Sequence, residues 1–275
     1  MTANDKEAYR MPFHDRGGLF PATAHEEAIA RILFLIEQQW PAGWLMGPAG
    51  CGKTTVLEAI RQRLRGGRGE AVYLSLCGVD ADEFWTEIAS ALGSRQIESG
   101  LAARRTIRGL LAASSMINRP VTILLDDVDR GIEPLWDAIA GLVRVVEGLG
   151  SGHTIVLASS GAMPTSDLAG RIDLRAEVGP FSKAETRAYL EHRLTSAGCP
   201  IGFDEEAASE LHQSTGGVPG VINRFADLAL VTAQAGEATS VTADLVRSAA
   251  LELRPIEDEP LVRFTVNQPA RRASA

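Results

Sequence analysis

The sequence predicts an α/β fold in which a parallel sheet of five strands lies between helices and is followed by a small all-helical domain. Three observations predict this arrangement: five short apolar runs end at turn or polar residues, helical patterns separate these runs, and no further strand pattern follows Pro180. Strands that alternate with helices form parallel sheets that helices cover on both faces. The 275 residues, of which 45% are hydrophobic, are enough to bury such a core.

The elements of the sheet domain can be placed by their patterns. Residues 26–39 predict the first helix, because apolar side chains recur at helical spacing until Pro41. The five strands are expected at residues 44–46, 71–76, 121–125, 154–158 and 174–178. Helices are expected between them, among others at residues 54–64, 81–92 and 134–149.

The second domain is predicted from four amphipathic helices at residues 182–197, 204–215, 219–235 and 242–253. Ser182 and Glu185 form the pattern of a capping box, which marks the start of the first of them. The boundary is therefore expected near Gly179 and Pro180, with a sheet domain and its N-terminal extension at residues 1–179 and a helical domain at residues 180–254. Three prolines indicate an irregular tail at residues 255–275.

The formal charge of -8 disfavours a general electrostatic contact with nucleic acid or with an anionic membrane. Nucleic-acid binding stays open only through a local basic strip, formed by Arg61, Arg63, Arg65 and Arg68. The alternative for these four arginines is a solvated helix end, where basic residues are common.

Three features of the sequence predict a cytoplasmic protein that does not insert directly into a membrane. The three cysteines, an odd number without metal-ligand spacing, fit a reducing compartment. Residues 1–10 are polar and lack the apolar core of a signal peptide. The apolar runs also stay well short of the ~20 residues that a membrane helix needs.

A phosphate-binding loop follows the first strand. In the pattern G-x-x-x-x-G-K-[ST], backbone N–H groups wrap the phosphates, the lysine reaches the β and γ phosphates, and the hydroxyl binds Mg2+. Lys53 and Thr54 take these two roles here. The predicted cofactors are ATP or ADP with Mg2+, and the predicted nucleotide-binding residues are Gly47, Pro48, Ala49, Gly50, Cys51, Gly52, Lys53, Thr54 and Thr55.

Two carboxylates follow the third strand, at the end of a parallel sheet where ligands gather. Asp126 is predicted to hold Mg2+ together with Thr54, and Asp127 is predicted to polarise the attacking water as a catalytic residue beside Lys53. Most ATPases have a glutamate at the second position, which reaches one methylene further than Asp127. The alternative for the pair is an acidic strand end without chemistry. Asp129 is interpreted as a cap of the helix near residue 134 rather than as a further ligand.

Ser159 and Ser160 end the fourth strand, near the expected position of the γ-phosphate. A role as sensors of that phosphate and an ordinary turn after the strand both explain such a serine pair. The sequence leaves these two interpretations open.

The order of these motifs resembles AAA+ ATPases of the ExeA/GspA type, a group related to transposition ATPases of the TniB and MuB kind. The resemblance covers residues 19–254 and is carried by the phosphate-binding loop, the strand with Asp126 and Asp127, the strand that ends at Ser159, and residues 171–182 and 215–223. It implies that the helical domain is an AAA+ lid over the nucleotide.

The resemblance also implies a catalytic arginine. Arg171 is at the finger position, where it would contact ATP bound to a neighbouring subunit and neutralise charge on the transferred phosphoryl group. Arg175 is the reserve candidate. The alternative for Arg171 is a surface ion pair with Glu177 or Asp173.

Two departures from the family pattern bear on activity. The family usually has Asp-Glu where this chain has Asp126 and Asp127, which predicts slow hydrolysis. The family also has a sensor arginine directly after the lid proline, where this chain has Gly220. Arg224 lies one helical turn later and is the candidate substitute.

The leading hypothesis is an ATPase that couples nucleotide state to assembly with itself, as a ring or filament, and to the remodelling or recruitment of a protein partner that the sequence leaves open. The alternatives are a nucleic-acid-binding regulator of the transposition type, a non-hydrolysing nucleotide-dependent scaffold and a small-molecule kinase. The helical lid and the pair Asp126 and Asp127 argue against the kinase.

Overall fold

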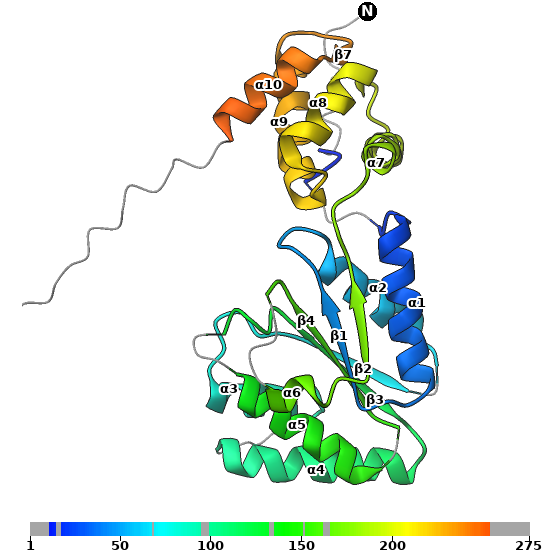
Figure 1. Ribbon diagram of the computed structural model, residues 1–275, viewed down its shortest axis with the longest axis vertical. Coiled ribbons are helices and arrows are strands. Elements are labelled where there is room, and N and C mark those ends of the chain that lie inside the picture. The colour runs from blue at the N-terminus through cyan, green and yellow to red at the C-terminus, as the bar shows by residue number, and fades with distance from the viewer. Residues whose placement is uncertain are drawn as a thin grey trace, which may run out of the picture.

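The computed structural model describes residues 11–14, 18–67, 69–94, 99–131, 135–150, 152–161 and 166–253. These residues form two parts stacked along the long axis of the molecule, a sheet domain and a helical lid (Figure 1). The tail predicted at residues 255–275, Arg254 and the first ten residues lie outside the described residues. The domain limits at residues 179 and 254 stay predictions.

Five parallel strands form the sheet, and the predicted α/β fold class is confirmed. They are β1 (Ala42–Met46), β2 (Glu70–Ser75), β3 (Val121–Asp126), β4 (Thr154–Ser159) and β5 (Leu174–Glu177), in the spatial order β2-β3-β4-β1-β5. All four pairs of neighbours are parallel. The register pairs Met46 with Ser159 and Ser75 with Asp126, so the carboxyl ends of the strands lie along one edge.

Helices cover both faces of this sheet. One face carries α1 (Thr23–Glu37) and α2 (Lys53–Leu64), and the other carries α3 (Ala81–Ala91), α4 (Gly100–Met116) and α5 (Trp136–Leu149), with the short α6 (Ser166–Ala169) against α5 (Figure 1). Alternate residues of a strand point to opposite faces. Leu124 therefore packs into the core with α1 and α2, whereas Ile123 and Leu125 pack into the core with α3, α4 and α5. Burial on both faces explains why the strands read as continuous apolar runs.

Helix α4 is not among the elements that the sequence patterns place. Ser99 is its N-cap and accepts a hydrogen bond from Ala102 N at 3.3 Å. Its buried stripe is narrow and consists of Ala103, Ile107 and Leu111. Such a stripe gives a weak periodic signal. Among the described residues, no helix combines the length and the apolar character that a membrane span requires.

The lid has four helices close to the predicted positions, namely α7 (Lys183–Ala197), α8 (Glu205–Thr215), α9 (Pro219–Ala235) and α10 (Ala243–Glu252). The predicted capping box is present, because Ser182 Oγ accepts from Glu185 N and the Glu185 carboxylate accepts from Ser182 N. The lid also contains two short strands, β6 (Gly202–Phe203) and β7 (Ser240–Val241), which pair in parallel. It is therefore mostly rather than entirely helical, and two residues are too few to show a strand period in the sequence.

The segment before α1 packs against the lid. Phe13 and Phe20 belong to the lid core, where their rings lie 6.1 Å and 5.4 Å from the ring of Tyr189. Phe13 N also donates a hydrogen bond to Asp227 Oδ1 at 3.1 Å. The described residues before α1, which are expected in the sheet domain, thus also belong to the lid core.

Candidate functional site

The phosphate-binding loop joins β1 to α2 and approaches other backbone closely. Gly50 and Gly52 have φ angles of +80° and +92°, in the left-handed region that favours glycine. A Cβ atom on Gly47 would lie 2.2 Å from the carbonyl oxygen of Val178, so a side chain has no room there. The glycines of the motif are therefore required by this geometry, and they leave the N-terminus of α2 without a side-chain cap. An uncapped helix N-terminus is favourable for an anionic phosphate.

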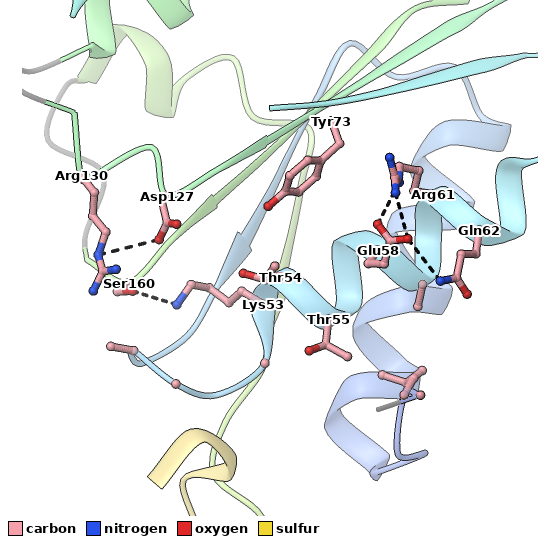
Figure 2. Close-up of a pocket in the computed structure, with 16 residues that line it drawn as sticks. Lys53, Thr54, Thr55, Glu58, Arg61, Gln62, Tyr73, Asp127, Arg130 and Ser160 are labelled. Atoms are coloured by element: carbon pink, nitrogen blue, oxygen red, sulfur yellow. Dashed lines mark hydrogen bonds and ion pairs between the residues drawn. The ribbon is translucent and has the colours of Figure 1, made fainter. Parts of the chain in front are cut away.

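Lys53 is the first residue of α2 and its side chain bends back over the loop. Its Nζ donates to Gly47 O at 2.7 Å, to Pro48 O at 3.1 Å and to Ser160 Oγ at 2.8 Å (Figure 2). Burial lowers the pKa of Lys53 below its usual range, while the nearby carboxylates oppose this shift. The ammonium thus lies among neutral acceptors that phosphate oxygens can replace.

A candidate Mg2+ position lies between α2 and β3. Thr54 Oγ1 donates to Asp126 Oδ2 at 2.6 Å, and the buried Asp126 carboxylate also accepts from the Tyr73 hydroxyl at 2.9 Å. A hydroxyl and a carboxylate are the hard oxygen ligands that Mg2+ prefers, so these residues fit the ion. Sequence reasoning missed Tyr73, whose β2 position can be related to Asp126 only through the strand order.

Asp127 lies directly after β3 with its side chain at the cavity. Its φ angle is +52°, which is uncommon for a residue with a Cβ atom. Asp127 N donates to Asp126 Oδ1 at 2.9 Å, and Asp127 Oδ1 lies 3.8 Å from Arg130 Nε. Strained backbone of this kind is frequent at functional sites.

The interpretation of Asp129 as a helix cap is wrong. Its Oδ2 accepts from Ser160 N at 2.9 Å and from Gly161 N at 3.1 Å, whereas the N-cap of α5 is Leu135, which makes no side-chain cap. Asp129 therefore joins the loop after β3 to the loop after β4. The two loops are adjacent because β3 and β4 are neighbours in the sheet, which the sequence does not reveal.

The two serines after β4 have different surroundings. Ser159 is fully buried, accepts from Trp44 Nε1 at 2.9 Å and donates to Gly161 O at 3.2 Å. Ser160 lines the cavity and accepts from Lys53. Of the two candidate sensors, the structure thus brings Ser160 to Lys53, while Ser159 holds the strand end in place.

Residues of the phosphate-binding loop, of α2 and of the loops after β3 and β4 line a cavity of about 680 Å3, which suits a small-molecule ligand (Figure 2). Its lining residues include Gly50, Lys53, Thr54, Thr55, Glu58, Tyr73, Asp127, Arg130 and Ser160. A smaller pocket of about 140 Å3 shares several of its walls and extends between the sheet domain and the lid. The smaller pocket thus connects the large cavity to the lid, whose described residues do not line the large cavity itself.

His25 is a residue of this region that sequence reasoning missed. Its Nε2 donates to Cys51 O at 2.8 Å, and its ring lies 5.4 Å from the ring of Phe181, at the entry to the lid. Burial is the main cause that lowers the pKa of His25. A Cβ atom on Gly52 would lie 2.8 Å from His25 Nε2. His25 therefore couples α1 to the phosphate-binding loop.

The predicted finger arginine lies far from the phosphate-binding loop of its own chain. Arg171 precedes β5, at the amino edge of the sheet, whereas the loop lies at the carboxyl edge. Its Nη1 lies 2.5 Å from Glu147 Oε2, and its Nε lies 3.2 Å from Asp167 Oδ1. These partners differ from the predicted alternatives Glu177 and Asp173. The finger role stays a prediction, which this location allows only toward another chain.

The remaining arginine candidates also lie away from the cavity. The guanidinium of Arg175 lies 5.5 Å from the centre of the Trp44 ring. Arg224 is exposed on α9 and does not line the cavity. Gly220, at the family's sensor position, instead packs on the phosphate-binding loop, because its N donates to Gly50 O at 2.9 Å. The lid thus contacts the loop through backbone.

A comparison with known protein families shows which family the residues around this site resemble. Residues 38–162 match the family model described as AAA domain. This stretch is similar to AAA domains. It includes the phosphate-binding loop, both aspartates and both serines, whereas Arg171 and the lid follow it.

A relative extends the similarity beyond the AAA domain. General secretion pathway protein A from Aeromonas hydrophila is 26% identical over 257 residues, which cover 88% of this chain and 46% of the relative. The chain thus spans about half the length of that relative. The resemblance to the ExeA/GspA type is confirmed, and the relation to TniB and MuB stays a prediction.

Solved structures share the fold of the AAA domain and the part that follows it. Cdc6p from Pyrobaculum aerophilum matches with a TM-score of 0.71 and 16% identity over 88% of this chain and 70% of that one. Drosophila ORC bound to DNA matches with a TM-score of 0.70 and 16% identity over 92% of this chain and 68% of that one. Aeropyrum pernix ORC2, solved in ADPNP and ADP complexes, matches with a TM-score of 0.62 and 16% identity over 89% of this chain and 71% of that one. At these identities the similarity concerns the fold alone.

Proposed function

We propose that this chain binds ATP with Mg2+ and hydrolyses it slowly. The observation that carries the proposal is that Lys53 and Thr54 line a cavity large enough for a nucleotide, while the buried Asp126 carboxylate is hydrogen-bonded to Thr54. A cation, a hydroxyl and a buried carboxylate in this arrangement are suited to a phosphate chain and a divalent ion. The AAA domain assignment supports the same function.

Each residue has a task that its surroundings support. Lys53 exchanges the loop carbonyls for oxygens of the β and γ phosphates. Thr54 and Asp126 hold Mg2+, which offsets phosphate charge when it is bound. Asp127 orients the attacking water and accepts its proton. The short Asp127 side chain supports a low rate, because a glutamate would reach one methylene further.

We further propose that the nucleotide state controls assembly of this chain with itself and contact with a protein partner. The location of Arg171 at the edge away from its own phosphate-binding loop supports a site shared between copies. We also propose a cytoplasmic location, which the free cysteines Cys51, Cys77 and Cys199 support.

Titration of ATP and Mg2+ against the Lys53→Ala variant tests the proposal. Loss of the ammonium is expected to weaken ATP binding by about a hundredfold or more, because a charge-assisted contact to two phosphates disappears. Lys183→Ala, which removes an exposed lysine of α7, is the matched control and is expected to bind like the parent. Unchanged ATP affinity of Lys53→Ala, with a native circular dichroism spectrum, contradicts the proposal.

Contact with nucleic acid is a second candidate function, which one observation supports. Helix α4 carries no acidic residue and exposes Arg105 and Arg108 in a chain of net charge -8. The strip predicted near the end of α2 is less suitable, because Arg61 pairs with Glu58. DNA affinity with and without ATP across a salt series distinguishes the two functions, since phosphate contacts weaken steeply with salt.

A further inference from the structure

We propose that Arg130 is a cis-acting cation of the nucleotide site, which contacts the γ-phosphate of ATP bound to its own chain. The inference rests on the ATP site proposed above and adds a residue that the sequence motifs do not contain. Arg130 lies on the loop after β3, and its side chain lines the large cavity with Lys53, Asp127 and Ser160 (Figure 2).

The backbone of Arg130 is held in place from several sides. Arg130 N donates to Asp127 O at 2.9 Å, and its carbonyl accepts from Gly78 N at the same distance. The preceding residue, Asp129, accepts from Ser160 N at 2.9 Å. These bonds tie the loop to the strand ends that carry the site, so the side chain starts from a fixed point beside the cavity.

The side chain itself can change its partner. It is 55% exposed, and its Nε lies 3.8 Å from Asp127 Oδ1, which is longer than a hydrogen bond. A guanidinium presents several donors in a plane and binds phosphate oxygens in a bidentate manner. A γ-phosphate in the cavity carries more negative charge than one carboxylate. ATP therefore draws Arg130 away from Asp127 and leaves that carboxylate available to the attacking water.

The other arginines that the resemblance indicates do not supply this charge in cis. Arg171 is bound to Glu147 and Asp167 at the opposite edge of the sheet. Gly220 replaces the sensor arginine of the lid, and Arg224 does not line the cavity.

Among the described residues that line the cavity, three are cationic: Lys53, Arg61 and Arg130. Arg61 is already paired with Glu58, at 2.8 Å. Lys53 and Arg130 remain at the end of the cavity where Asp127 and Ser160 lie (Figure 2). ATP carries one negative charge more than ADP, and Arg130 supplies a cation beside Lys53 that balances it.

Binding of two nucleotides to Arg130→Ala tests this inference. A non-hydrolysable ATP analogue with Mg2+ is expected to bind about tenfold to a hundredfold more weakly than to the parent, as for the loss of a charge-assisted hydrogen bond. ADP with Mg2+ is expected to bind within about twofold of the parent, because it lacks the γ-phosphate. Arg130→Lys keeps the charge and is expected to recover part of the loss. Arg119→Ala, in the exposed loop before β3, is the matched control.

The same measurement in the Asp127→Asn background separates contact with the phosphate from an effect through Asp127. If Arg130 contacts the γ-phosphate, its removal weakens binding of the analogue in both backgrounds. A loss only in the parent background, an equal loss for ADP, or no loss at all overturns the inference. If the parent chain binds neither nucleotide, the proposed function fails together with the inference. Binding of both by the parent, with unchanged selectivity in Arg130→Ala, overturns the inference alone.

Discussion

The carboxyl edge of the sheet and the segment before β5 both carry charged residues, but these charges are arranged in opposite ways. At the carboxyl edge, Lys53 and Asp126 are buried and hydrogen-bonded to groups that line or border one cavity. Before β5, Arg171 is partly exposed and paired with Glu147 and Asp167. Buried charges whose hydrogen-bond partners belong to the same chain indicate a binding site that one chain can form. A surface arginine with local partners indicates a site only if another molecule replaces those partners.

The largest expected effect concerns the carboxyl edge of the sheet. Asp127→Asn is expected to lower ATP turnover by about a hundredfold or more while ATP still binds, because the amide cannot accept the proton of water. Asp127→Glu is expected to raise turnover, because the longer side chain reaches further. Steady-state phosphate release measures both, with Asp137→Asn on the exposed start of α5 as the control. Parent-like turnover of Asp127→Asn favours the acidic strand end without chemistry.

Arg171→Ala tests the exposed side, with a smaller expected effect. ATP affinity of the single chain is expected to stay unchanged, while hydrolysis in the assembled state falls about tenfold or more. Mixing this variant with Lys53→Ala is expected to restore some hydrolysis, because an intact finger then faces an intact phosphate-binding loop. If co-assembled chains show no recovery, or if Arg171→Ala hydrolyses ATP like the parent, Arg175 becomes the next candidate.

The smallest expected effect concerns pH and compares a histidine of the site with one outside it. Burial lowers the pKa of both His25 and His153 below the ordinary value of 6.5. The unfolded chain then takes up protons at higher pH than the folded chain. Stability is therefore fully present above about pH 6.5 and falls as the pH drops below it, by at most about 1.4 kcal/mol per pH unit for each histidine.

Urea unfolding between about pH 5 and pH 8 measures this slope. His25→Gln and His153→Gln are each expected to reduce the slope of unfolding free energy against pH. His153 bonds to Ser115 and to the backbone of Val121, away from the phosphate-binding loop, and is the matched control. A parent-like slope in His25→Gln shows that His25 does not titrate differently on folding.

Much of the fold and of the site could be predicted from local patterns. The five strands, the four lid helices and the capping box at Ser182 each depend on residues close together in the sequence. Helix α4 could not be placed in this way, because three buried residues over 17 positions give a weak period. The roles of Tyr73, Asp129 and His25 were missed because each contacts a residue that is far away in the sequence.

The sequence by itself determined the phosphate-binding loop and the carboxylate that joins it, because their spacing and their flanking apolar runs leave one arrangement at a strand end. Only the tertiary structure decided which neighbours these residues have. The strand order placed Tyr73 beside Asp126 and Ser160 beside Lys53, and it brought Arg130 to the same cavity. The physical reason is that strand order and loop contacts arise from packing of the whole core. A pattern of neighbouring residues does not encode that order or those contacts.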